Sequence, residues 1–388
     1  MLKRSIALAL CLEMMIFCLA ACKTGDADIT DSTTTADTTT VPTTTTAATT
    51  ADPKLAELAQ YLSTVTYNNF ELTGTNEPYF MGRWFEKEIS GVSHMVTVTS
   101  GSHCYFMTDG ATSIDVEFTL LTREKSTHFA YSIDGGTPVR QRVTNKTVTL
   151  PDAEYHTVRI IADGIEEGGG KKWTEEQGYA LKSITASEGG SIYGIKPKNK
   201  IVFYYGDSIT EGIYALGSDA EYNSAVNSFT WHSAEKLGVT PYFIGYGASG
   251  FTVSGSFAPM IDAIDYNSKD RPLTDTTVPD VIVISHGTNE SSTSRDAFET
   301  AAKAAIERLN EKYPNTPIIF LGHGSSVNQK YVLCPGIADD YENVYWVGSK
   351  PWGITFTDSC HPNAAGAKKL GNKLADEMIS ILGEDFFK

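Results

Sequence analysis

Five short apolar segments in the second half of the chain constrain its fold more than any other feature. They read IVFYYG (201–206), PYFIGYG (241–247), DVIVISHG (280–287), PIIFLGHG (317–324) and VYWVG (344–348). Apolar residues between and after them recur at helical spacing: Phe298, Ala302, Ile306, Leu309 and Tyr313, then Leu370, Leu374, Met378 and Ile381. Continuous apolar strands that alternate with amphipathic helices predict a parallel sheet covered by helices on both faces.

Polar and glycine-rich segments follow four of these strands. They are GDSITEG (206–212), GYGASGFT (245–252), SHGTNES (285–291) and FTDSCHPNAAG (356–366). Ligands bind to parallel sheets at the carboxyl ends of the strands, so we expect these four segments to surround one site.

Each segment offers one chemical function and also has a plain structural explanation. Ser208, between a strand and a helix, can expose its hydroxyl as a nucleophile, or it can simply cap the helix. Asn289 can donate an amide N–H to an oxyanion, and glycines such as Gly250 can leave backbone N–H groups free. Asp358 lies three residues before His361, a spacing that lets a carboxylate reach the imidazole Nδ1 and leave Nε2 as a base.

Taken together and in this order, GDSIT, GASG, GTNE and DSCHPN resemble the conserved blocks of the SGNH (GDSL-type) hydrolase superfamily, over about Lys198 to the C-terminus. The resemblance implies a flavodoxin-like domain at 196–388, with Ser208 as nucleophile, His361 as general base and Asp358 orienting the imidazole. It also implies an oxyanion hole made by the backbone N–H groups of Ser208 and Gly250 and the Asn289 amide, and it requires no cofactor and no metal.

Two features of this pattern qualify the resemblance. Glu290 stands where the superfamily commonly has aspartate, and we expect it to adjust only the surroundings of the oxyanion donor. Some relatives lack the carboxylate at the position of Asp358 and orient the histidine with a backbone carbonyl, so both arrangements stay open.

Residues 55–195 have a different pattern. SIDVEFTLL (113–121) alternates apolar and polar residues, and HFAYSIDGG (128–136) repeats this alternation before the turn signal Asp-Gly-Gly. HTVRIIADG (156–164) offers apolar Val158 and Ile160, again before Asp-Gly. This predicts an all-β jelly roll or sandwich ahead of the hydrolase domain. With the segments GRWF (82–85), AYSIDGG (130–136) and AEYHTVRII (153–161), the two-part arrangement resembles carbohydrate esterase family 2, which are two-domain acetyl xylan esterases.

The first 54 residues carry targeting signals. Lys3 and Arg4 precede an apolar stretch that ends in Leu-Ala-Ala-Cys at Cys22, which predicts a lipoprotein signal at 1–21 with lipidation of Cys22. An ordinary secretory signal or a membrane anchor is the alternative. Threonine dominates the rest of 22–54, which predicts a disordered linker that holds the folded part away from the cell surface.

The net charge argues against nucleic acid as a partner, and the cysteine spacing argues against a zinc site. The 388 residues have a formal net charge of −16 at pH 7, which disfavours binding to nucleic acid. Of the six cysteines, Cys104, Cys334 and Cys360 lie beyond the targeting segments, with no close pair and no zinc-ligand spacing.

The resemblance to carbohydrate esterase family 2 implies a serine esterase that removes O-acetyl groups from plant polysaccharides of the xylan or mannan type. The targeting signals predict that it is extracellular and lipid-anchored. The candidates for stacking on the sugar are Trp352, Trp231 and Trp346, although core packing explains each of them as well. Two alternatives stay open: an esterase for another acyl group or for envelope glycan, and a glycan-binding lipoprotein without turnover.

Overall fold

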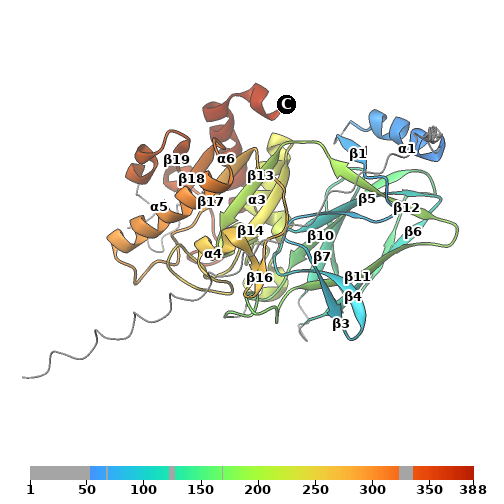
Figure 1. Ribbon diagram of the computed structural model, residues 1–388, viewed down its shortest axis with the longest axis horizontal. Coiled ribbons are helices and arrows are strands. Elements are labelled where there is room, and N and C mark those ends of the chain that lie inside the picture. The colour runs from blue at the N-terminus through green and yellow to red at the C-terminus, as the bar shows by residue number, and fades with distance from the viewer. Residues whose placement is uncertain (1–52, 67–68, 122–126, 168, 323–334) are drawn as a thin grey trace, which may run out of the picture. The chain divides into compact units, whose positions relative to one another are not determined.

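A computed structural model describes residues 53–66, 69–121, 127–167, 169–322 and 335–388. These residues belong to one compact unit (Figure 1). The predicted signal peptide, Cys22, most of the predicted linker, His323 and Cys334 lie outside the described residues. Among the described residues, no helix is both long and apolar enough to span a membrane.

The first part of this unit is a sandwich of two antiparallel sheets, as predicted. The seven-stranded sheet contains β1 (Phe70–Leu72), β12 (Ser191–Pro197), β5 (His103–Asp109), β10 (His156–Gly164), β7 (His128–Ile133) and β8 (Val139–Arg142) in this order, with β2 (Tyr79–Met81) also paired to β5. The five-stranded sheet contains β3 (Phe85–Ile89), β4 (Val92–Thr97), β11 (Tyr179–Ala186), β6 (Ser113–Leu120) and β9 (Thr147–Thr149). Apolar side chains from both sheets form the core between them, among them Phe106, Val116, Phe129, Ile160 and Leu181.

Two central strands of the sandwich are buried on both faces. Ala130 of β7 and Ile161 of β10 are fully buried in a cluster that also contains Trp231 and Phe243 from the second part of the chain. This contact covers a second face of β7 and β10, so most residues of both strands are buried.

The second part is the predicted parallel sheet. Its strands lie in the order β14 (Thr240–Gly245), β13 (Ile201–Gly206), β17 (Val281–Ser285), β18 (Ile318–Gly322) and β19 (Val344–Gly348). Numbered along the chain this order is 2-1-3-4-5, that of the flavodoxin-like fold. The predicted fold class is therefore confirmed.

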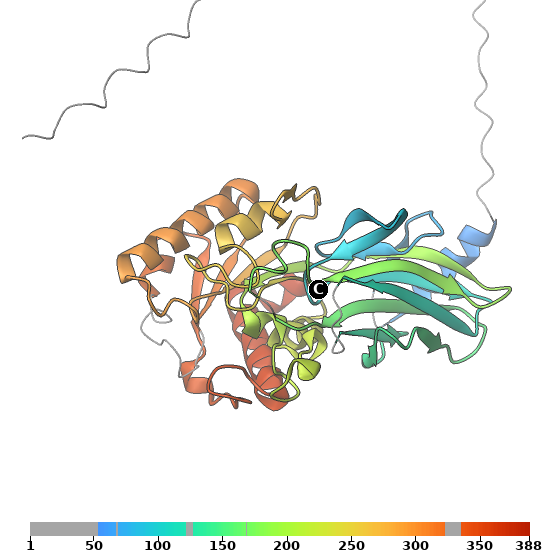
Figure 2. The same cartoon turned by 90° about the horizontal axis from the view of Figure 1, so that it is seen from below.

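Alternate residues of the parallel strands face opposite helical layers. Val202 and Tyr204 of β13 pack with α3 (Phe229–Leu237) and α6 (Ala364–Leu382), whereas Phe203 and Tyr205 pack with α4 (Met260–Asp265) and α5 (Arg295–Lys312). Figure 2 shows α5 (orange) and α6 (red) on opposite sides of the sheet. The remaining elements are α1 (Pro53–Thr64), the four-residue helix α2 (Ser208–Glu211), the hairpin β15 (Tyr266–Ser268) and β16 (Arg271–Pro272), and the 3-10 turns η1 (Ala220–Tyr222), η2 (Ala225–Asn227), η3 (Pro335–Asp340), η4 (Lys350–Trp352) and η5 (Glu384–Phe387).

The structure bears on two predicted boundaries, the end of the linker and the junction between the sandwich and the parallel-sheet part. The predicted linker reached residue 54, but helix α1 begins at Pro53 and packs Leu58 and Leu62 into the core. These two leucines are four residues apart, which is helical spacing. The sheets change from antiparallel to parallel between Pro197 and Ile201, yet the sandwich and the parallel-sheet part share one compact unit, so the domain boundary at 195/196 stays a prediction.

Candidate active site

Ser208 lies at the first residue of α2, directly beyond the carboxyl end of β13. Asp207 is the N-cap, and its carboxylate accepts a hydrogen bond of 2.9 Å from the Ile209 N–H. Because Asp207 caps the helix, Ser208 is not the capping residue, and its side chain is available for another partner. This arrangement removes the structural explanation that the sequence left open for Ser208.

The two glycines of GDSITEG are required by close packing. A Cβ on Gly206 would lie 1.9 Å from Thr210 Oγ1. Gly212, the C-cap of α2, has φ 87°, and a Cβ there would lie 2.1 Å from the Ser224 carbonyl oxygen. Glycine therefore lets the chain leave the strand, make one turn around Ser208 and leave again within seven residues.

The structure brings Ser208, His361 and Asp358 together. His361 Nε2 is 2.9 Å from Ser208 Oγ, and His361 Nδ1 is 2.8 Å from Asp358 Oδ2. The other oxygen of Asp358 accepts backbone N–H groups from Cys360 at 2.7 Å and from His361 at 2.6 Å. Asp358 thus holds its own loop as well as the imidazole.

These contacts select the tautomer of the neutral imidazole. Partial burial raises the pKa of Asp358, but the hydrogen bonds from the N–H groups and ring of His361 and from the Cys360 N–H outweigh it and lower the pKa below its usual value. An ionised carboxylate only accepts hydrogen bonds, so the neutral imidazole carries its proton on Nδ1. Nε2 is then free to accept the Ser208 hydroxyl proton.

The histidine loop is fastened at both sides. The Thr357 hydroxyl donates to the Tyr214 carbonyl at 2.7 Å, and the Tyr214 ring meets the imidazole edge-on with centroids 5.1 Å apart. Asn363 caps α6 by accepting from the Gly366 N–H at 2.9 Å. Tyr214 was not among the predicted site residues, and no pattern in the sequence marks it.

The three predicted oxyanion donors differ in whether their N–H groups already make hydrogen bonds within the protein. The Ser208 N–H lies in the first turn of α2, where N–H groups have no intrahelical acceptor. The Asn289 amide donates to the Ser249 carbonyl at 2.9 Å and makes only a long contact of 3.5 Å with Asp207 Oδ2. The Gly250 N–H donates to the Val253 carbonyl at 2.9 Å, so it would have to give up this bond to serve an oxyanion.

Glu290 organises the loop that carries Gly250. Its fully buried carboxylate accepts from the N–H groups of Phe251 at 2.6 Å and Thr252 at 3.1 Å, and from the Thr252 and Thr293 hydroxyls. A Cβ on Gly250 would lie 2.2 Å from Glu290 Oε1. The expectation that Glu290 adjusts only the surroundings of the oxyanion donor agrees with these contacts.

Cys360 does not compete with Ser208 as a nucleophile. Burial, with the nearby carboxylates of Asp207 and Asp358, raises the pKa of its thiol to about 12. Thiols react as thiolates, so this cysteine stays inert at neutral pH. Cys104 is fully buried in the sandwich core and is also a free thiol.

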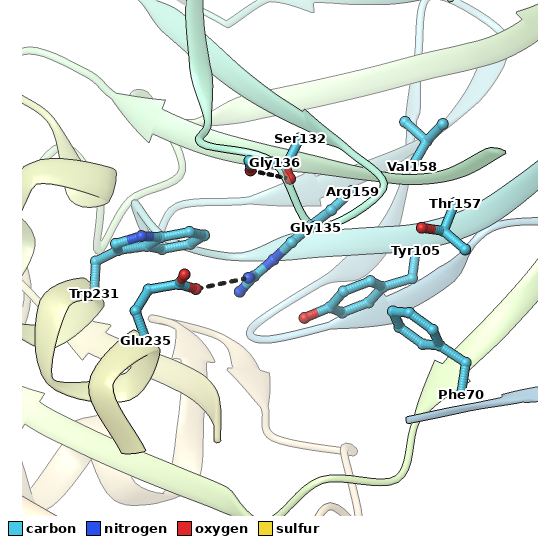
Figure 3. A pocket seen from close by; sticks show the side chains of 10 residues that line it. All are labelled: Phe70, Tyr105, Ser132, Gly135, Gly136, Thr157, Val158, Arg159, Trp231 and Glu235. Carbon is cyan, nitrogen blue, oxygen red and sulfur yellow. Dashed lines mark hydrogen bonds and ion pairs between the residues drawn. The ribbon is translucent and has the colours of Figure 1, made fainter. Parts of the chain in front are cut away.

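Trp231 does not lie open to a substrate. It is 4% exposed on α3, and the Arg159 guanidinium of β10 covers its ring at 4.2 Å (Figure 3). Arg159 also lies over Tyr105 and faces Glu235 at 3.9 Å, and all three line the pocket beside Trp231. The prediction of Trp231 as a sugar-stacking residue is not supported, because packing between the sandwich and α3 occupies its ring.

The other two tryptophans have different surroundings. Trp352, in η4, is half-buried against the cluster that also receives Cys360, the neighbour of His361. Trp346 on β19 packs edge-on against Phe320, with centroids 5.3 Å apart, and Phe320 contacts Phe251 behind the Gly250 loop. Trp352 therefore stays the better candidate for a substrate contact.

Over the ranges that the structure describes, no three His, Cys, Asp or Glu side chains are grouped so as to hold a metal ion. His286 follows β17 and is buried against Phe251, with ring centroids 5.4 Å apart.

Comparison with known proteins identifies the C-terminal part. Residues 204–369 match the model of the GDSL-like Lipase/Acylhydrolase family. The C-terminal part is a GDSL-like lipase/acylhydrolase domain. The match begins three residues before the Asp207–Ser208 turn and ends within α6, so it contains every residue of the predicted triad and oxyanion hole.

Solved structures share the fold of both parts of the chain. A family two carbohydrate esterase from Clostridium thermocellum in complex with cellohexaose is similar with a TM-score of 0.64 and 19% identity, over 79% of this chain and 100% of that one. An acetyl xylan esterase from the rumen bacterium Butyrivibrio proteoclasticus gives 0.61 and 14%, over 81% and 99%. A salicylyl-acyltransferase from a tetracycline biosynthetic pathway gives 0.57 and 14%, over 80% and 98%.

At these identities the likeness establishes the two-part architecture that the sequence predicted. No curated protein matches the sequence. The substrate therefore has to be argued from the site.

Proposed function

We propose that this protein is a serine esterase that removes O-acetyl groups from polysaccharides of the xylan or mannan type. The observation that carries the proposal is the continuous set of contacts from Asp358 through His361 to Ser208, at 2.8 Å and 2.9 Å. A serine, a correctly oriented imidazole and a carboxylate in this order are the parts of an acyl-transferring triad.

The reaction proceeds through two transfers. Ser208 Oγ attacks the acetyl carbonyl carbon while its proton passes to His361 Nε2. The bond between the carbonyl carbon and the sugar oxygen then breaks, and His361 returns the proton to that oxygen. Water repeats the sequence on the acetyl-serine and releases acetate and free Ser208.

Negative charge on the carbonyl oxygen would be stabilised by the Ser208 N–H and the Asn289 amide, with Gly250 joining if it releases Val253. Each such donor contributes on the order of 3 kcal/mol to lowering the barrier. We propose Asp358 as the residue that holds the imidazole, and Trp352 as the sugar-facing aromatic.

The substrate class and location are further parts of this proposal. The carbohydrate esterases and the acetyl xylan esterase that share the two-part fold support an acetylated glycan as substrate. The Ala-Ala-Cys sequence before and at Cys22 and the threonine-rich segment after it support a lipid-anchored position outside the cell, where such polymers occur.

Hydrolysis of 4-nitrophenyl acetate tests the proposal. Ser208→Ala should lower kcat by about 10⁴-fold or more, because the nucleophile is removed while binding groups remain. Cys360→Ala, the matched control one residue from the base, should retain the wild-type rate. Equal rates for wild type and Ser208→Ala would remove Ser208 from the mechanism, and inactivity of the wild type would favour a glycan-binding protein.

A separate experiment is needed to identify the molecule that accepts the acyl group, since a salicylyl-acyltransferase shares the fold. Acetate release from acetylated xylan, acetylated mannan and acetylated envelope glycan should be fastest for one of the plant polymers. Transfer of the acyl group to an added alcohol faster than to water would instead identify an acyltransferase.

A further inference from the structure

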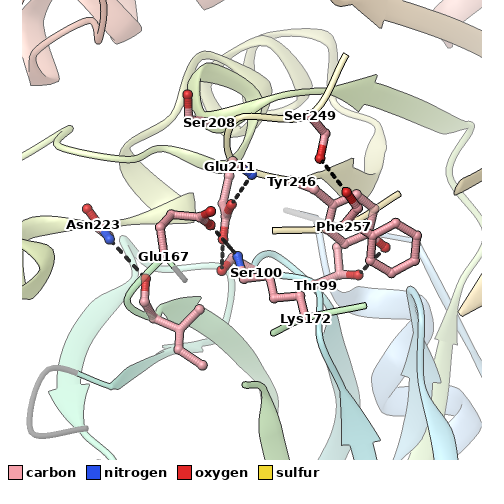
Figure 4. Close-up of polar contacts among 12 residues, drawn as sticks. Thr99, Ser100, Glu167, Lys172, Ser208, Glu211, Asn223, Tyr246, Ser249 and Phe257 are labelled. Carbon is pink, nitrogen blue, oxygen red and sulfur yellow. Dashed lines mark hydrogen bonds and ion pairs between the residues drawn. The ribbon is translucent and has the colours of Figure 1, made fainter. Parts of the chain in front are cut away.

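A buried lysine of the sandwich contacts the helix that carries Ser208. Lys172 lies in the connection between β10 and β11, and its side chain is fully buried. Its ammonium group contacts Glu167 Oε1 at 2.6 Å and, at very short range, Glu211 Oε1 (Figure 4). Glu211 is the last residue of α2, one turn after Ser208.

Glu211 in turn joins the nucleophile helix α2 to the loop that carries Gly250. Its second oxygen accepts the Gly247 N–H at 3.2 Å, and Gly247 belongs to the loop that leads to Gly250. Ser100, from another loop of the sandwich, donates its hydroxyl to Oε1 at 2.9 Å. One carboxylate therefore connects the nucleophile helix, the oxyanion loop and the sandwich.

The same connection also fixes that loop through its backbone. The Lys172 N–H donates to the Ser256 carbonyl at 3.1 Å, and the Ser256 N–H donates to the Gly247 carbonyl at 2.9 Å. A Cβ on Gly247 would lie 2.0 Å from Glu167 Oε2, so Glu167 packs directly on this loop. Gly247 is thus held by Glu211 of the nucleophile helix, by Glu167 of the sandwich, and by Ser256 of its own loop, which Lys172 holds in turn.

The pKa values of the two glutamates in this cluster shift in opposite directions. Burial and the neighbouring Glu167 raise the pKa of Glu211 well above its usual value, against the opposing effect of Lys172. Burial also opposes ionisation of Glu167, but Lys172 outweighs it and lowers its pKa. Of the two acids, Glu167 is therefore the more readily ionised partner of Lys172.

Stability alone is a weak reason for such a cluster, because apolar residues of similar volume usually fill a buried site at least as favourably. Its polar groups do fix directions, which apolar packing does not.

We infer that Lys172 is a positioning residue for catalysis, which acts through Glu211 to hold the Ser208 helix against the Gly247–Gly250 loop. This inference rests on the proposed esterase function. The sandwich thereby supplies part of the catalytic geometry, although none of its residues contacts the triad in the part of the chain described here.

The test compares full-length Lys172→Met with full-length Glu175→Gln. Glu175 lies in the same connection and pairs with Arg271 of the parallel-sheet part at 3.0 Å, but not with the catalytic loops. Lys172→Met should lower kcat for 4-nitrophenyl acetate about tenfold or more and change KM less than about twofold, because misplacement of reacting groups slows the chemical step. Glu175→Gln should keep the wild-type kcat at neutral pH.

Lys172→Met leaves the buried Glu211 and the partly buried Glu167 without a cation and can therefore fail to fold. The variant Lys172→Met/Glu167→Gln removes this charge imbalance. It should regain most of the lost melting temperature while kcat stays low. A wild-type kcat in either folded variant, or an equal loss in Glu175→Gln, would overturn the inference.

A second measurement separates this inference from the esterase proposal. The rate at which an alkyl fluorophosphonate labels Ser208 reports the nucleophile without any substrate turnover. It should fall in the Lys172 variants to the same extent as kcat. If the wild type is labelled but hydrolyses no ester, the esterase proposal fails, while an unchanged labelling rate in the Lys172 variants overturns the positioning role.

Discussion

Asp358 makes three hydrogen bonds, all within its own loop, and only one of them goes to the imidazole. The two backbone bonds explain how a carboxylate three residues before the base is held in line with it. The spacing in the sequence predicted this contact, because a loop of that length brings the two side chains together.

Asp358→Asn should lower kcat between about 10²- and 10⁴-fold with little change in melting temperature. Asparagine can keep the backbone bonds to Oδ1, but its amide would donate to Nδ1 and favour the tautomer with the proton on Nε2. That tautomer cannot accept the Ser208 proton. Ester hydrolysis at saturating substrate is the measurement.

Asp152→Asn is the matched control, since Asp152 also contacts a histidine, His156, at 3.1 Å in the sandwich. It should retain the wild-type kcat. An unchanged kcat in Asp358→Asn would mean that a backbone carbonyl orients His361, the arrangement known from some relatives.

Residue patterns predicted the triad but not the groups around it. Strand periodicity placed Ser208 after β13 and Asn289 after β17, whereas the resemblance to the SGNH superfamily implied their roles and that of His361. Lys172 meets Glu211 across 39 positions, and Ser100 meets it across 111. No local pattern encodes such pairs, and Trp231 failed as a prediction for the same reason.

At the scale of elements, α2 is short and depends on its two ends. Asp207 caps its beginning, and Gly212 ends it in the left-handed region. Helix α3 ends in the same way at Gly238, with φ 68°. The two C-caps differ in their surroundings, since a Cβ on Gly238 would meet nothing within 4 Å.

This difference predicts unequal effects of alanine. Gly238→Ala should cost about 1–2 kcal/mol of unfolding free energy from the left-handed backbone alone. Gly212→Ala should cost more, because its Cβ also collides with the Ser224 carbonyl, and it should lower kcat by moving Ser208. Denaturant unfolding and ester hydrolysis measure both variants, and equal losses of stability would show that the loop at Ser224 moves aside freely.

At the scale of the molecule, ion pairs link the sandwich to the parallel-sheet part. Glu175 contacts Lys87 at 2.6 Å and Arg271 at 3.0 Å. Burial opposes its ionisation, but Arg271, Lys87 and Ser268 outweigh burial and lower the pKa of Glu175 to about 2.

This shift predicts a specific acid sensitivity. A carboxylate with a lowered pKa in the folded state stabilises that state above its unfolded pKa of about 4.5, and the stabilisation is lost as pH falls toward about 2. Glu175→Gln should therefore be less stable than wild type at pH 6, and the difference should shrink between pH 4.5 and 2. Denaturant unfolding across this range is the measurement, and a constant difference would contradict the assignment.

Much of the overall architecture was predictable because strand and helix periodicities are local. The contact between the two parts was not. It buries Ala130, Ile161 and Phe243 on faces that have no distinctive pattern in the sequence. Such burial depends on which surfaces meet after each part has formed its own sheet.

The 2.9 Å contact between Ser208 and His361 joins residues 153 positions apart. A ribosome delivers the nucleophile early and the base only with the last helix. A nascent or truncated chain that ends before His361 thus contains Ser208 without its general base and cannot hydrolyse an ester by this route. Esterase activity would then appear only after the whole parallel sheet has folded, so its onset could be used to follow folding of the C-terminal part.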